Sequence, residues 1–515
     1  MTRLPTSFIA SAVLVFALAL APAGAQTPPP PAQAAPAAAK DSAAAKDGPS
    51  PSLPPDSYSR RTAMIASERV SYAATAGSLP IYGAKGEVTA KVFYVSYVRD
   101  APAGTRPLTF VFNGGPGAGT AFLHLGAIGP RVVNFDENGS APVQPARLAD
   151  NPDSWLAFTD LVFVDPVGTG FSRATAEGEE GEKQFYGVQK DADALADFVQ
   201  LYLTRTDRAL SPVFLAGESY GGFRCVLLAK RLLSAGVQVK GAVLLSPALE
   251  FALIRGDDYT LLPLALALPS IAASNLELKE GHNASLDLLG EVEAFARTGY
   301  LLHLASGLRQ DDGVTALLER YTGIDKDIIA RHYGRVSASL FVREYRRLKD
   351  IALSRYDGSI SAPLPRPGDN DHFDPILDRA ITVLRPAMAQ YVRQELGYRT
   401  DLEYRLLARD ISGKWDYGTT PNRQGYADAL DDLREARTNN PALKIMIAHG
   451  YTDLVTPYSV SQFLIDQLRP IEGAAPITLK VYRGGHMMYL RAPSRHQLQE
   501  DAQDLYRSVS EAAND

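Results

Sequence analysis

The segment Val213-Phe-Leu-Ala-Gly-Glu-Ser-Tyr-Gly-Gly222 constrains the fold of this chain more than any other. A short apolar run, typical of a buried strand, enters Gly217-Glu-Ser-Tyr-Gly221, and a helix-like run over 223–234 leaves it. In that context a Gly-x-Ser-x-Gly match predicts a sharp, strained turn that holds the Ser219 hydroxyl clear of a sheet. We expect glycine at positions 217 and 221 because a Cβ would collide across the turn. The alternative is a Gly-rich strand-to-helix turn with an incidental serine.

Short apolar runs recur along the chain and alternate with helical stretches such as 190–203. Near-continuous apolar strands suit a sheet whose two faces are both covered, and alternation with helices predicts mostly parallel pairing. The sequence therefore predicts an α/β fold with a mostly parallel central sheet and helices on both faces. The strand-like runs are 81–82, 88–98, 108–112, 161–164, 213–216, 242–245, 445–448 and 479–482.

Helical periodicity dominates between Pro247 and Asn440. We expect a helical insertion over about residues 255–420 that covers the functional site as a lid. The alternative is a separate helical domain with its own core. The insertion is favoured because strand-like runs resume after it.

The N-terminus has the pattern of an export signal. Arg3 supplies the positive charge, residues 8–20 the apolar core, and Ala23-Gly-Ala25 a small-residue cleavage site. This predicts a signal peptide over 1–25, with a retained membrane anchor as the alternative. The Pro- and Ala-rich stretch 26–58 predicts a disordered linker, so we expect the catalytic domain over 59–515. The predicted location is periplasmic or secreted, without stable membrane insertion after cleavage.

Charge and cysteine content exclude several classes of protein. The formal net charge is -6 and no long basic run occurs, which gives no support for nucleic-acid binding. The single cysteine, Cys225, allows no internal disulfide and is expected to be a small buried residue. The sequence has no metal-ligand spacing, phosphate loop or dinucleotide fingerprint, so we expect neither a metal nor a cofactor.

A serine hydroxyl becomes a nucleophile when a base takes its proton and a third group orients that base. His486 follows one strand-like run, in Val481-Tyr-Arg-Gly-Gly-His-Met487, and Asp453 follows another. The order Ser219, Asp453, His486 is that of the catalytic triad in the α/β-hydrolase fold. His449 and His124 also compete for the role of base, but their positions favour structural or peripheral roles.

Acyl transfer also requires hydrogen-bond donors for an oxyanion. One is the backbone N–H of Tyr220, directly after the nucleophile. The second is expected from Asn113-Gly-Gly-Pro-Gly117, the loop after the third predicted strand. A plain Gly-rich turn is the alternative. Asp165 is expected to be structural and to tie loops together near the site.

These motifs together resemble those of the serine carboxypeptidase family over roughly residues 80–490. Several motifs in one order are more specific than any single match. The missing family disulfides suit a bacterial-type member, and the insertion is recognisable only by its position and by one short motif. The shared segments are Asn113-Gly-Gly-Pro-Gly117, Asn151-Pro-Asp-Ser-Trp155, Phe163-Val-Asp-Pro-Val-Gly-Thr-Gly-Phe-Ser172, Gly217-Glu-Ser-Tyr-Gly221, Tyr356-Asp-Gly358 and Gly484-Gly-His-Met487.

The resemblance implies a serine-type carboxypeptidase that acts on peptides with a free C-terminus. It assigns the oxyanion hole to the N–H groups of Gly115 and Tyr220. It implies that Asn113, Gly114 and Glu218 bind the substrate's C-terminal carboxylate. The carboxyl group of Glu218 and the C-terminal carboxylate of the substrate would lie so close that they must share one proton. Binding of the substrate is therefore favoured at acidic pH. The alternative for Glu218 is an ordinary acid near a helix N-terminus.

Two departures from the family pattern weaken the expected carboxylate recognition. Many members place a second glutamate where this chain has Ala127, and the usual tryptophan before Asn-Gly-Gly is absent, with Val111 and Phe112 in its stretch. An esterase or acyltransferase of the same fold is therefore the first alternative function. A non-catalytic binding protein is the second.

Overall fold

The computed structural model describes residues 53–100, 106–142, 146–176, 178–254, 259–347, 351–363, 373–418 and 427–511. The predicted signal peptide and most of the predicted linker lie outside these residues. The folded part begins earlier than the predicted residue 59, because β1 starts at Ser57 and Asp56 accepts a hydrogen bond from the Ser78 amide at 3.0 Å.

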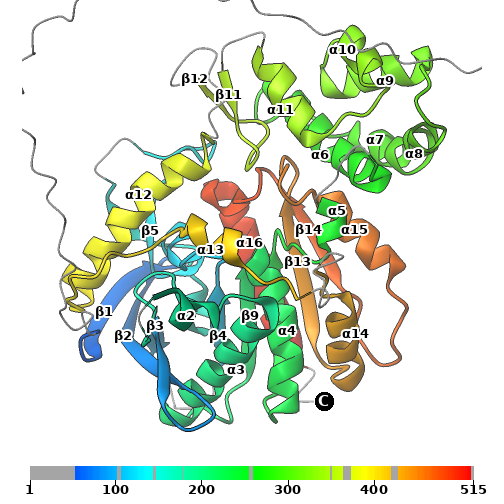
Figure 1. The fold of residues 1–515 in the computed structure, drawn as a ribbon. Helices are drawn as coiled ribbons and strands as arrows, with labels where there is room; N and C mark the ends of the chain where they lie inside the picture. The colour runs from blue at the N-terminus through cyan, green and yellow to red at the C-terminus, as the bar shows by residue number, and fades with distance from the viewer. Residues whose placement is uncertain are drawn as a thin grey trace, which may run out of the picture. The chain divides into compact units, whose positions relative to one another are not determined.

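The described residues form a central sheet of ten strands in the order β1-β2-β3-β7-β4-β9-β10-β13-β14, with β8 paired to β3 (Figure 1). Across the sheet, neighbouring strands from β7 through β4, β9, β10 and β13 to β14 pair in parallel. The pairs β1-β2, β2-β3 and β3-β7 are antiparallel. Each predicted strand-like run lies in one of these strands, which confirms the mostly parallel sheet. The strands are β1 (Ser57–Ile65), β2 (Glu68–Tyr82), β3 (Val88–Arg99), β4 (Leu108–Phe112), β7 (Asp160–Val164), β8 (Arg173–Ala174), β9 (Val213–Glu218), β10 (Val239–Leu245), β13 (Lys444–Gly450) and β14 (Thr478–Tyr482). Two small hairpins add β5 (Arg131–Val133) with β6 (Leu148–Asp150), and β11 (Ile351–Leu353) with β12 (Ser361–Pro363).

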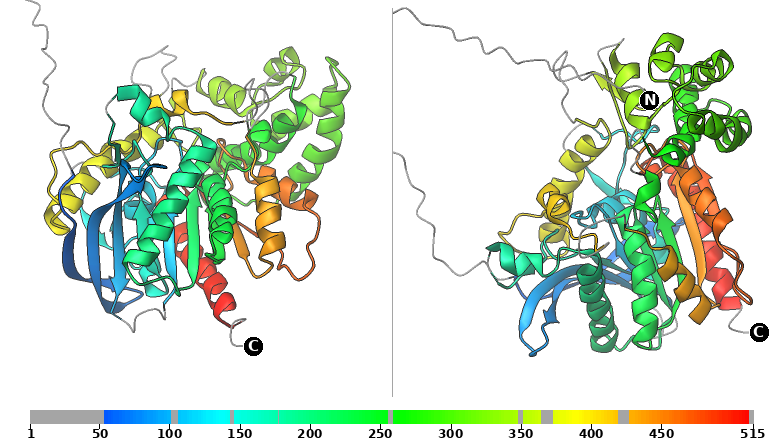
Figure 2. Two further views of the ribbon diagram at one scale, coloured as in Figure 1. Left: turned by 60° about the horizontal axis from the view of Figure 1, so that its bottom comes forward. Right: turned by 45° about the vertical axis from the view of Figure 1, so that its right-hand side comes forward.

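Both faces of the sheet are covered, as predicted. Side chains alternate along β9, so that Phe214 packs into one apolar cluster with Tyr506, and Leu215 packs into a second cluster with Phe198 and Phe223. Figures 1 and 2 show α16 on the opposite side of the sheet from α3 and α4. The helices and helical turns of this body are α1 (Ala121–Leu123), η1 (His124–Ile128), η2 (Trp155–Ala157), α2 (Gly178–Lys183), α3 (Val188–Arg205), α4 (Tyr220–Ser234), α5 (Phe251–Ile254), α12 (Leu377–Gln390), η4 (Tyr391–Glu395), α13 (Arg409–Lys414), α14 (Leu430–Asn439), α15 (Tyr458–Gln467), η5 (Met488–Leu490) and α16 (Ala492–Glu511).

The helical insertion between β10 and β13 has two parts. Its first part packs around its own apolar cluster, which includes Leu268, Tyr300 and Phe341. Its second part packs against the body, with Leu384 in one cluster of the sheet and Ile411 in the other. The region predicted as one lid therefore combines a small helical core with segments of the main core. The elements of the first part are α6 (Leu261–Glu280), α7 (Leu289–Phe295), η3 (Ala296–Tyr300), α8 (Leu301–Ala305), α9 (Asp312–Thr322), α10 (Lys326–Arg331) and α11 (Ala338–Arg347).

Helix α6 is long and apolar enough to cross a membrane, judged by length and composition among the described residues. However, 72% of the apolar 18-residue stretch of this helix is buried inside the fold. Leu268 and Ile271 of this helix lie in the apolar cluster of the insertion. A core helix accounts for this apolar run.

Candidate active site

Ser219 lies in the strained turn that the sequence predicts, between β9 and α4. Its backbone has φ 59° and ψ −122°, a conformation that a non-glycine residue adopts only when its surroundings enforce it. The Ser219 amide donates to the Leu245 carbonyl at 2.8 Å, which ties the turn to β10. A Cβ on Gly217 would overlap the Gly221 carbonyl, and one on Gly221 would lie 2.6 Å from the Phe112 carbonyl oxygen. The predicted collision across the turn is confirmed for Gly217, whereas Gly221 is required because the turn lies against the end of the neighbouring strand β4.

His486 and Asp453 meet at the carboxyl ends of neighbouring strands, and both are buried. The His486 Nδ1 atom lies 2.8 Å from Asp453 Oδ2. Because an ionised carboxylate only accepts, Nδ1 carries the hydrogen and Nε2 is left as an acceptor. This is the imidazole tautomer that a general base requires.

Thr456 holds the Asp453 carboxylate in place, and the sequence analysis did not identify it. Its hydroxyl donates to Asp453 Oδ2 at 2.8 Å and lies 3.1 Å from His486 Nδ1. Its amide and that of Val455 donate to Asp453 Oδ1 at 2.9 and 2.8 Å. An aspartate side chain commonly accepts from backbone amides shortly after it, so this turn has a sequence signal, but the bond from the Thr456 hydroxyl has none.

The pKa values of this pair move in opposite directions. Burial lowers the pKa of His486, but the charge and hydrogen bond of Asp453 outweigh it, so the net pKa lies above the usual value. Burial raises the pKa of Asp453, but the charge and hydrogen bond of His486 outweigh it, so the net pKa is lowered. The pair therefore stabilises an imidazolium beside an ionised aspartate.

The loops bearing Ser219 and His486 are joined through the end of β10. Ser246 follows Leu245, whose carbonyl holds the strained turn at Ser219 (the nucleophile elbow), and the Ser246 hydroxyl donates to the His486 carbonyl at 2.9 Å. Among the described residues the Ser219 hydroxyl makes no hydrogen bond with the His486 ring. The two groups thus share a common anchor without a direct bond.

The loop Asn113-Gly-Gly-Pro-Gly117 lies directly against the elbow. It follows β4 and not the third strand, because β1 was not predicted. A Cβ on Gly114 would lie 2.6 Å from the Tyr220 amide nitrogen, so the loop backbone runs beside that N–H. Gly115 has φ +100°, which favours glycine. The arrangement brings the two predicted sources of oxyanion donors side by side.

Glu218 precedes the nucleophile and is only 5% exposed. Its Oε2 accepts from the Asn113 side-chain amide, and its Oε1 accepts from the Tyr489 hydroxyl at 2.7 Å. Burial raises the pKa of Glu218 to about 7, although His486 and the two hydrogen bonds oppose the rise. Glu218 is therefore no solvated surface acid, and it carries a proton in neutral to acidic solution.

The two other histidines considered as bases are structural, as expected. His124 Nε2 lies 2.6 Å from the Tyr97 hydroxyl, and its ring stacks on Phe163 with centroids 4.0 Å apart. His449 Nε2 lies 2.8 Å from the Ser461 hydroxyl. Burial lowers the pKa of His124 to about 3 and that of His449 to about 4, so both stay neutral.

Asp165 ties loops together near the site, as predicted. Its Oδ1 accepts from the Thr120 amide at 2.7 Å, just after the Gly-rich loop, and from the Tyr404 hydroxyl at 3.3 Å. Cys225 is buried, and burial raises the pKa of its thiol to about 12, so it is no second nucleophile.

The insertion contacts the loop bearing His486 through Tyr356-Asp-Gly358. The His486 amide donates to the Tyr356 carbonyl, and the Tyr356 ring meets the imidazole edge to face at 5.3 Å. Asp357 pairs with Arg491 at 2.8 Å, and Arg491 also pairs with Glu277 of α6 at 3.1 Å. The lid is thus linked to the loop bearing His486 through buried ion pairs.

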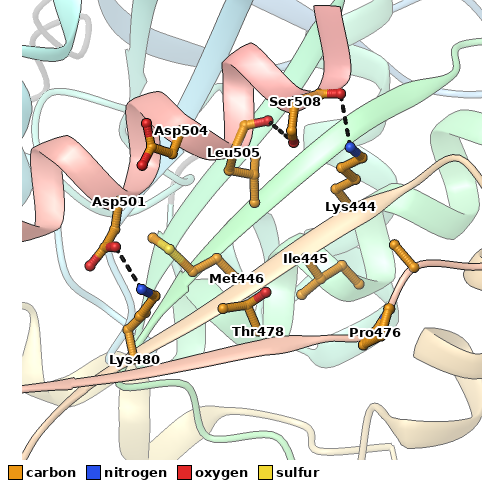
Figure 3. Close-up of a pocket in the computed structure, with 11 residues that line it drawn as sticks. Lys444, Ile445, Met446, Pro476, Thr478, Lys480, Asp501, Asp504, Leu505 and Ser508 are labelled. Carbon is orange, nitrogen blue, oxygen red and sulfur yellow. Dashed lines mark hydrogen bonds and ion pairs between the residues drawn. The ribbon is translucent and has the colours of Figure 1, made fainter. Parts of the chain in front are cut away.

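A cavity of about 400 Å³ lies elsewhere, between β13, β14 and α16 (Figure 3). It is lined by Lys444 at the start of β13, at the opposite end of that strand from Asp453. Its Lys480 pairs with Asp501 at 2.8 Å. None of the predicted site residues lines it. Within the described ranges, no cluster of three or more His, Cys, Asp or Glu side chains could hold a metal ion.

Comparisons with known proteins identify relatives of part of this chain. Residues 69–247 match the family model described as serine carboxypeptidase, which includes the Gly-rich loop and the elbow but not Asp453 or His486. The pheromone-processing carboxypeptidase kex1 of Sclerotinia sclerotiorum is 34% identical over 128 residues, 24% of this chain and 17% of the relative. The serine carboxypeptidase ctsa-3.2 of Caenorhabditis elegans is 30% identical over 137 residues, 26% of this chain and 25% of the relative. The matches thus span about a quarter or less of these relatives' lengths.

A solved structure matches over most of the chain. The crystal structure of Kex1(delta)p, a prohormone-processing carboxypeptidase from Saccharomyces cerevisiae, has a TM-score of 0.55 and 16% identity, and the match covers 85% of this chain and 91% of that chain. The relatives named here are fungal and nematode proteins, which does not support the predicted bacterial type. The chain has the α/β-hydrolase fold, and over residues 69–247 its sequence matches the serine carboxypeptidase family.

Proposed function

We propose that this protein is a serine-type carboxypeptidase that releases C-terminal residues from peptides. The observation that carries the proposal is the 2.8 Å hydrogen bond between the buried side chains of Asp453 and His486, beside the strained turn that bears Ser219. A base that has a free Nε2 atom, is oriented by a carboxylate and lies next to a serine is the arrangement that activates that serine. The family match over residues 69–247 supports the same chemistry.

In the proposed reaction the Ser219 hydroxyl gives its proton to His486 Nε2 and attacks the carbonyl carbon of the last peptide bond. The resulting oxyanion accepts hydrogen bonds from the Gly115 and Tyr220 amides. His486 then passes the proton to the leaving amine, and an acyl-enzyme remains on Ser219. Water, deprotonated by His486, hydrolyses that ester. Asp453 keeps the imidazole oriented and stabilises its charged form.

The missing hydrogen bond between Ser219 and His486 is compatible with this scheme. Catalytic hydrogen bonds in free enzymes are often long and tighten only when substrate is bound. The shared anchor through Leu245 and Ser246 limits how far the two loops can separate.

The choice of a carboxypeptidase over an esterase rests on Glu218. A protonated Glu218 can donate to the substrate's terminal carboxylate, together with the Asn113 side-chain amide and the backbone of Gly114. With a pKa of about 7, Glu218 is protonated below neutral pH, so we expect recognition of free carboxylates in that range. A substrate whose terminus is amidated lacks the charge that this arrangement selects.

The test compares three substrates: a peptide with a free C-terminus, its amidated twin and a simple ester. Near pH 7, where Glu218 is still partly protonated and more of His486 is neutral than at acidic pH, we expect the free peptide to be turned over far faster than the amidated one, and Ser219→Ala to abolish turnover of all three. Equal rates for free and amidated peptides would favour an esterase or acyltransferase. No turnover of any substrate by the wild type would favour a binding protein.

Export is part of the proposal and rests on the sequence alone. Residues 1–25 carry the charge, apolar core and small-residue site of a signal peptide, and a periplasmic or secreted enzyme follows from it. Expression of the full chain in a bacterial host, with N-terminal sequencing of the product, tests this. We expect cleavage after Ala25 and recovery outside the cytoplasm; an intact N-terminus in the cytoplasm would contradict it.

A further inference from the structure

Tyr489 contacts Glu218 in a way that the proposed mechanism has not used. Its hydroxyl donates to Glu218 Oε1 at 2.7 Å, and both side chains are buried. Among the described residues, Oε1 is the one acceptor to which the Tyr489 hydroxyl donates. The other oxygen, Oε2, accepts from the Asn113 side-chain amide. The two oxygens of one carboxyl group therefore face two different donors.

The position of the Tyr489 ring is fixed from two sides. It lies in the short turn η5, three residues after His486. A Cβ on Gly126 would lie 3.2 Å from Tyr489 Cε2, so the ring packs tightly on the backbone of η1, next to Ala127. The ring thus packs beside η1, with its hydroxyl within hydrogen-bond distance of Glu218.

The orientation of the Asn113 amide is also fixed. Its Oδ1 accepts from the Leu123 amide at 3.1 Å, so its NH₂ group must point to Glu218. One hydrogen of that NH₂ group stays on Oε2, and the second is available to a substrate carboxylate. In a carboxylic acid the carbonyl oxygen is the better acceptor, and a phenol is a stronger donor than an amide. An acid proton on Oε1 would leave the buried Tyr489 hydroxyl with the poorer acceptor, which is unfavourable. The proton is therefore directed to Oε2, the oxygen next to Asn113.

We propose that Tyr489 is a specificity-determining residue that directs the acid proton of Glu218 to Oε2, where it can bind the C-terminal carboxylate of a peptide. The inference rests on the proposed carboxypeptidase function and deepens it. It also offers a physical reason why this chain manages without a second glutamate at Ala127: one carboxyl group and one phenol take the place of two carboxyl groups. Tyr489 acts through Glu218 and takes no part in acyl transfer.

Several charged or titratable groups face Glu218 and contribute to its pH dependence. His486 and Asp453 lie on the neighbouring loops, the first lowering and the second raising the pKa of Glu218. Tyr356 of the insertion is also electrostatically coupled to Glu218. The hydrogen bond from Tyr489 lowers the pKa of Glu218, so its removal must move that pKa upward.

The experiment measures kcat and KM from pH 4 to 9 for Tyr489→Phe, with a free-carboxylate peptide and a simple ester. For the peptide we expect kcat/KM to fall roughly tenfold, mainly through KM, as for the loss of a hydrogen bond to a charged group. We also expect its alkaline limb to move to higher pH. Ester turnover should stay within about twofold, since the ester does not use Glu218.

A matched control is Tyr321→Phe. Tyr321 donates to Glu291 Oε1 at 2.6 Å in the insertion. This change therefore also removes a phenol hydroxyl that donates to a glutamate, and turnover of both substrates should be unchanged. The double variant Tyr489→Phe with Glu218→Gln separates positioning from packing. In the Glu218→Gln background the Tyr489 change should produce no further movement of the pH profile.

The outcomes are separable from those for the proposed function. If the wild type does not prefer the free peptide over its amidated twin, the carboxypeptidase proposal fails and this inference fails with it. If the wild type has that preference but Tyr489→Phe keeps the wild-type profile, only the inference is overturned. Equal losses on peptide and ester also overturn it. Should Tyr489→Phe not fold, Tyr489→Leu, which also removes the phenol hydroxyl, must move the alkaline limb in the same direction; an unmoved limb overturns the inference.

Discussion

The buried carboxyl group of Glu218 predicts a specific dependence of stability on pH. Burial raises its pKa from 4.5 to about 7 in the folded protein. Between these two pH values the folded state binds more protons at this position than the unfolded state, so stability falls as pH rises through the window. At about 1.36 kcal/mol per pKa unit, the rise corresponds to about 3 kcal/mol lost between pH 4 and pH 8.

Glu218→Gln removes this ionisation while keeping the size of the side chain. We expect the free energy of unfolding of the variant, relative to wild type, to increase by about 3 kcal/mol from pH 4 to pH 8, because only the wild type loses stability through this group. Urea unfolding of both proteins at four or five pH values measures the difference. Because groups that do not interact with Glu218 titrate equally in both proteins, the comparison isolates Glu218 together with its coupling to His486.

Glu277→Gln is the matched control for this measurement. Burial raises the pKa of Glu277, but His282 and Arg491 outweigh it and hold the net pKa below the usual value. Its contribution to stability is therefore present above pH 4.5 and is lost only as pH falls below that value. The Glu277→Gln difference should be constant from pH 5 to 8. A Glu218→Gln difference that is equally constant would refute the buried, protonated state of Glu218.

Three further substitutions test the surroundings of the site. Gly114→Ala should lower kcat by roughly 10²- to 10³-fold in single-turnover assays, because its Cβ would lie 2.6 Å from the Tyr220 amide and displace the oxyanion donors; wild-type kcat would contradict that role. Thr456→Val removes the hydroxyl that donates to Asp453 and should reduce kcat about five- to tenfold with little change in KM; a change in KM alone would argue against it. Arg491→Leu leaves the buried Asp357 carboxylate without its ion pair and removes one of the two arginines that pair with Glu277, so it should destabilise the protein by about 3–5 kcal/mol in urea, whereas a neutral result would show that the ion pairs do not hold the lid.

The parts of the fold that sequence patterns predict are those where one local feature determines the structure. Apolar runs such as 242–245 and 445–448 are buried on both faces, so their pattern predicts central strands directly. The strained turn at Ser219 is encoded by its two glycines. β1, by contrast, was not predicted, because it is an edge strand with alternate exposed positions that directly follows the Pro-rich stretch.

The missed features depend on contacts between distant segments. Tyr489 lies in a short helical turn whose sequence gives no sign that its hydroxyl meets Glu218, which lies far away in the chain. The two-part insertion was missed for a similar reason. Periodicity predicts the apolar face of α12, but it does not tell whether that face packs on the insertion or on the sheet.

The most direct test of the central claim, that Asp453 and His486 activate Ser219, is labelling with a fluorophosphonate followed by peptide mapping. The account predicts phosphonylation of the wild type on the peptide containing residue 219, none in Ser219→Ala, and strongly slowed labelling in His486→Ala. Equal labelling of wild type and Ser219→Ala, or a wild type that does not react, would contradict it.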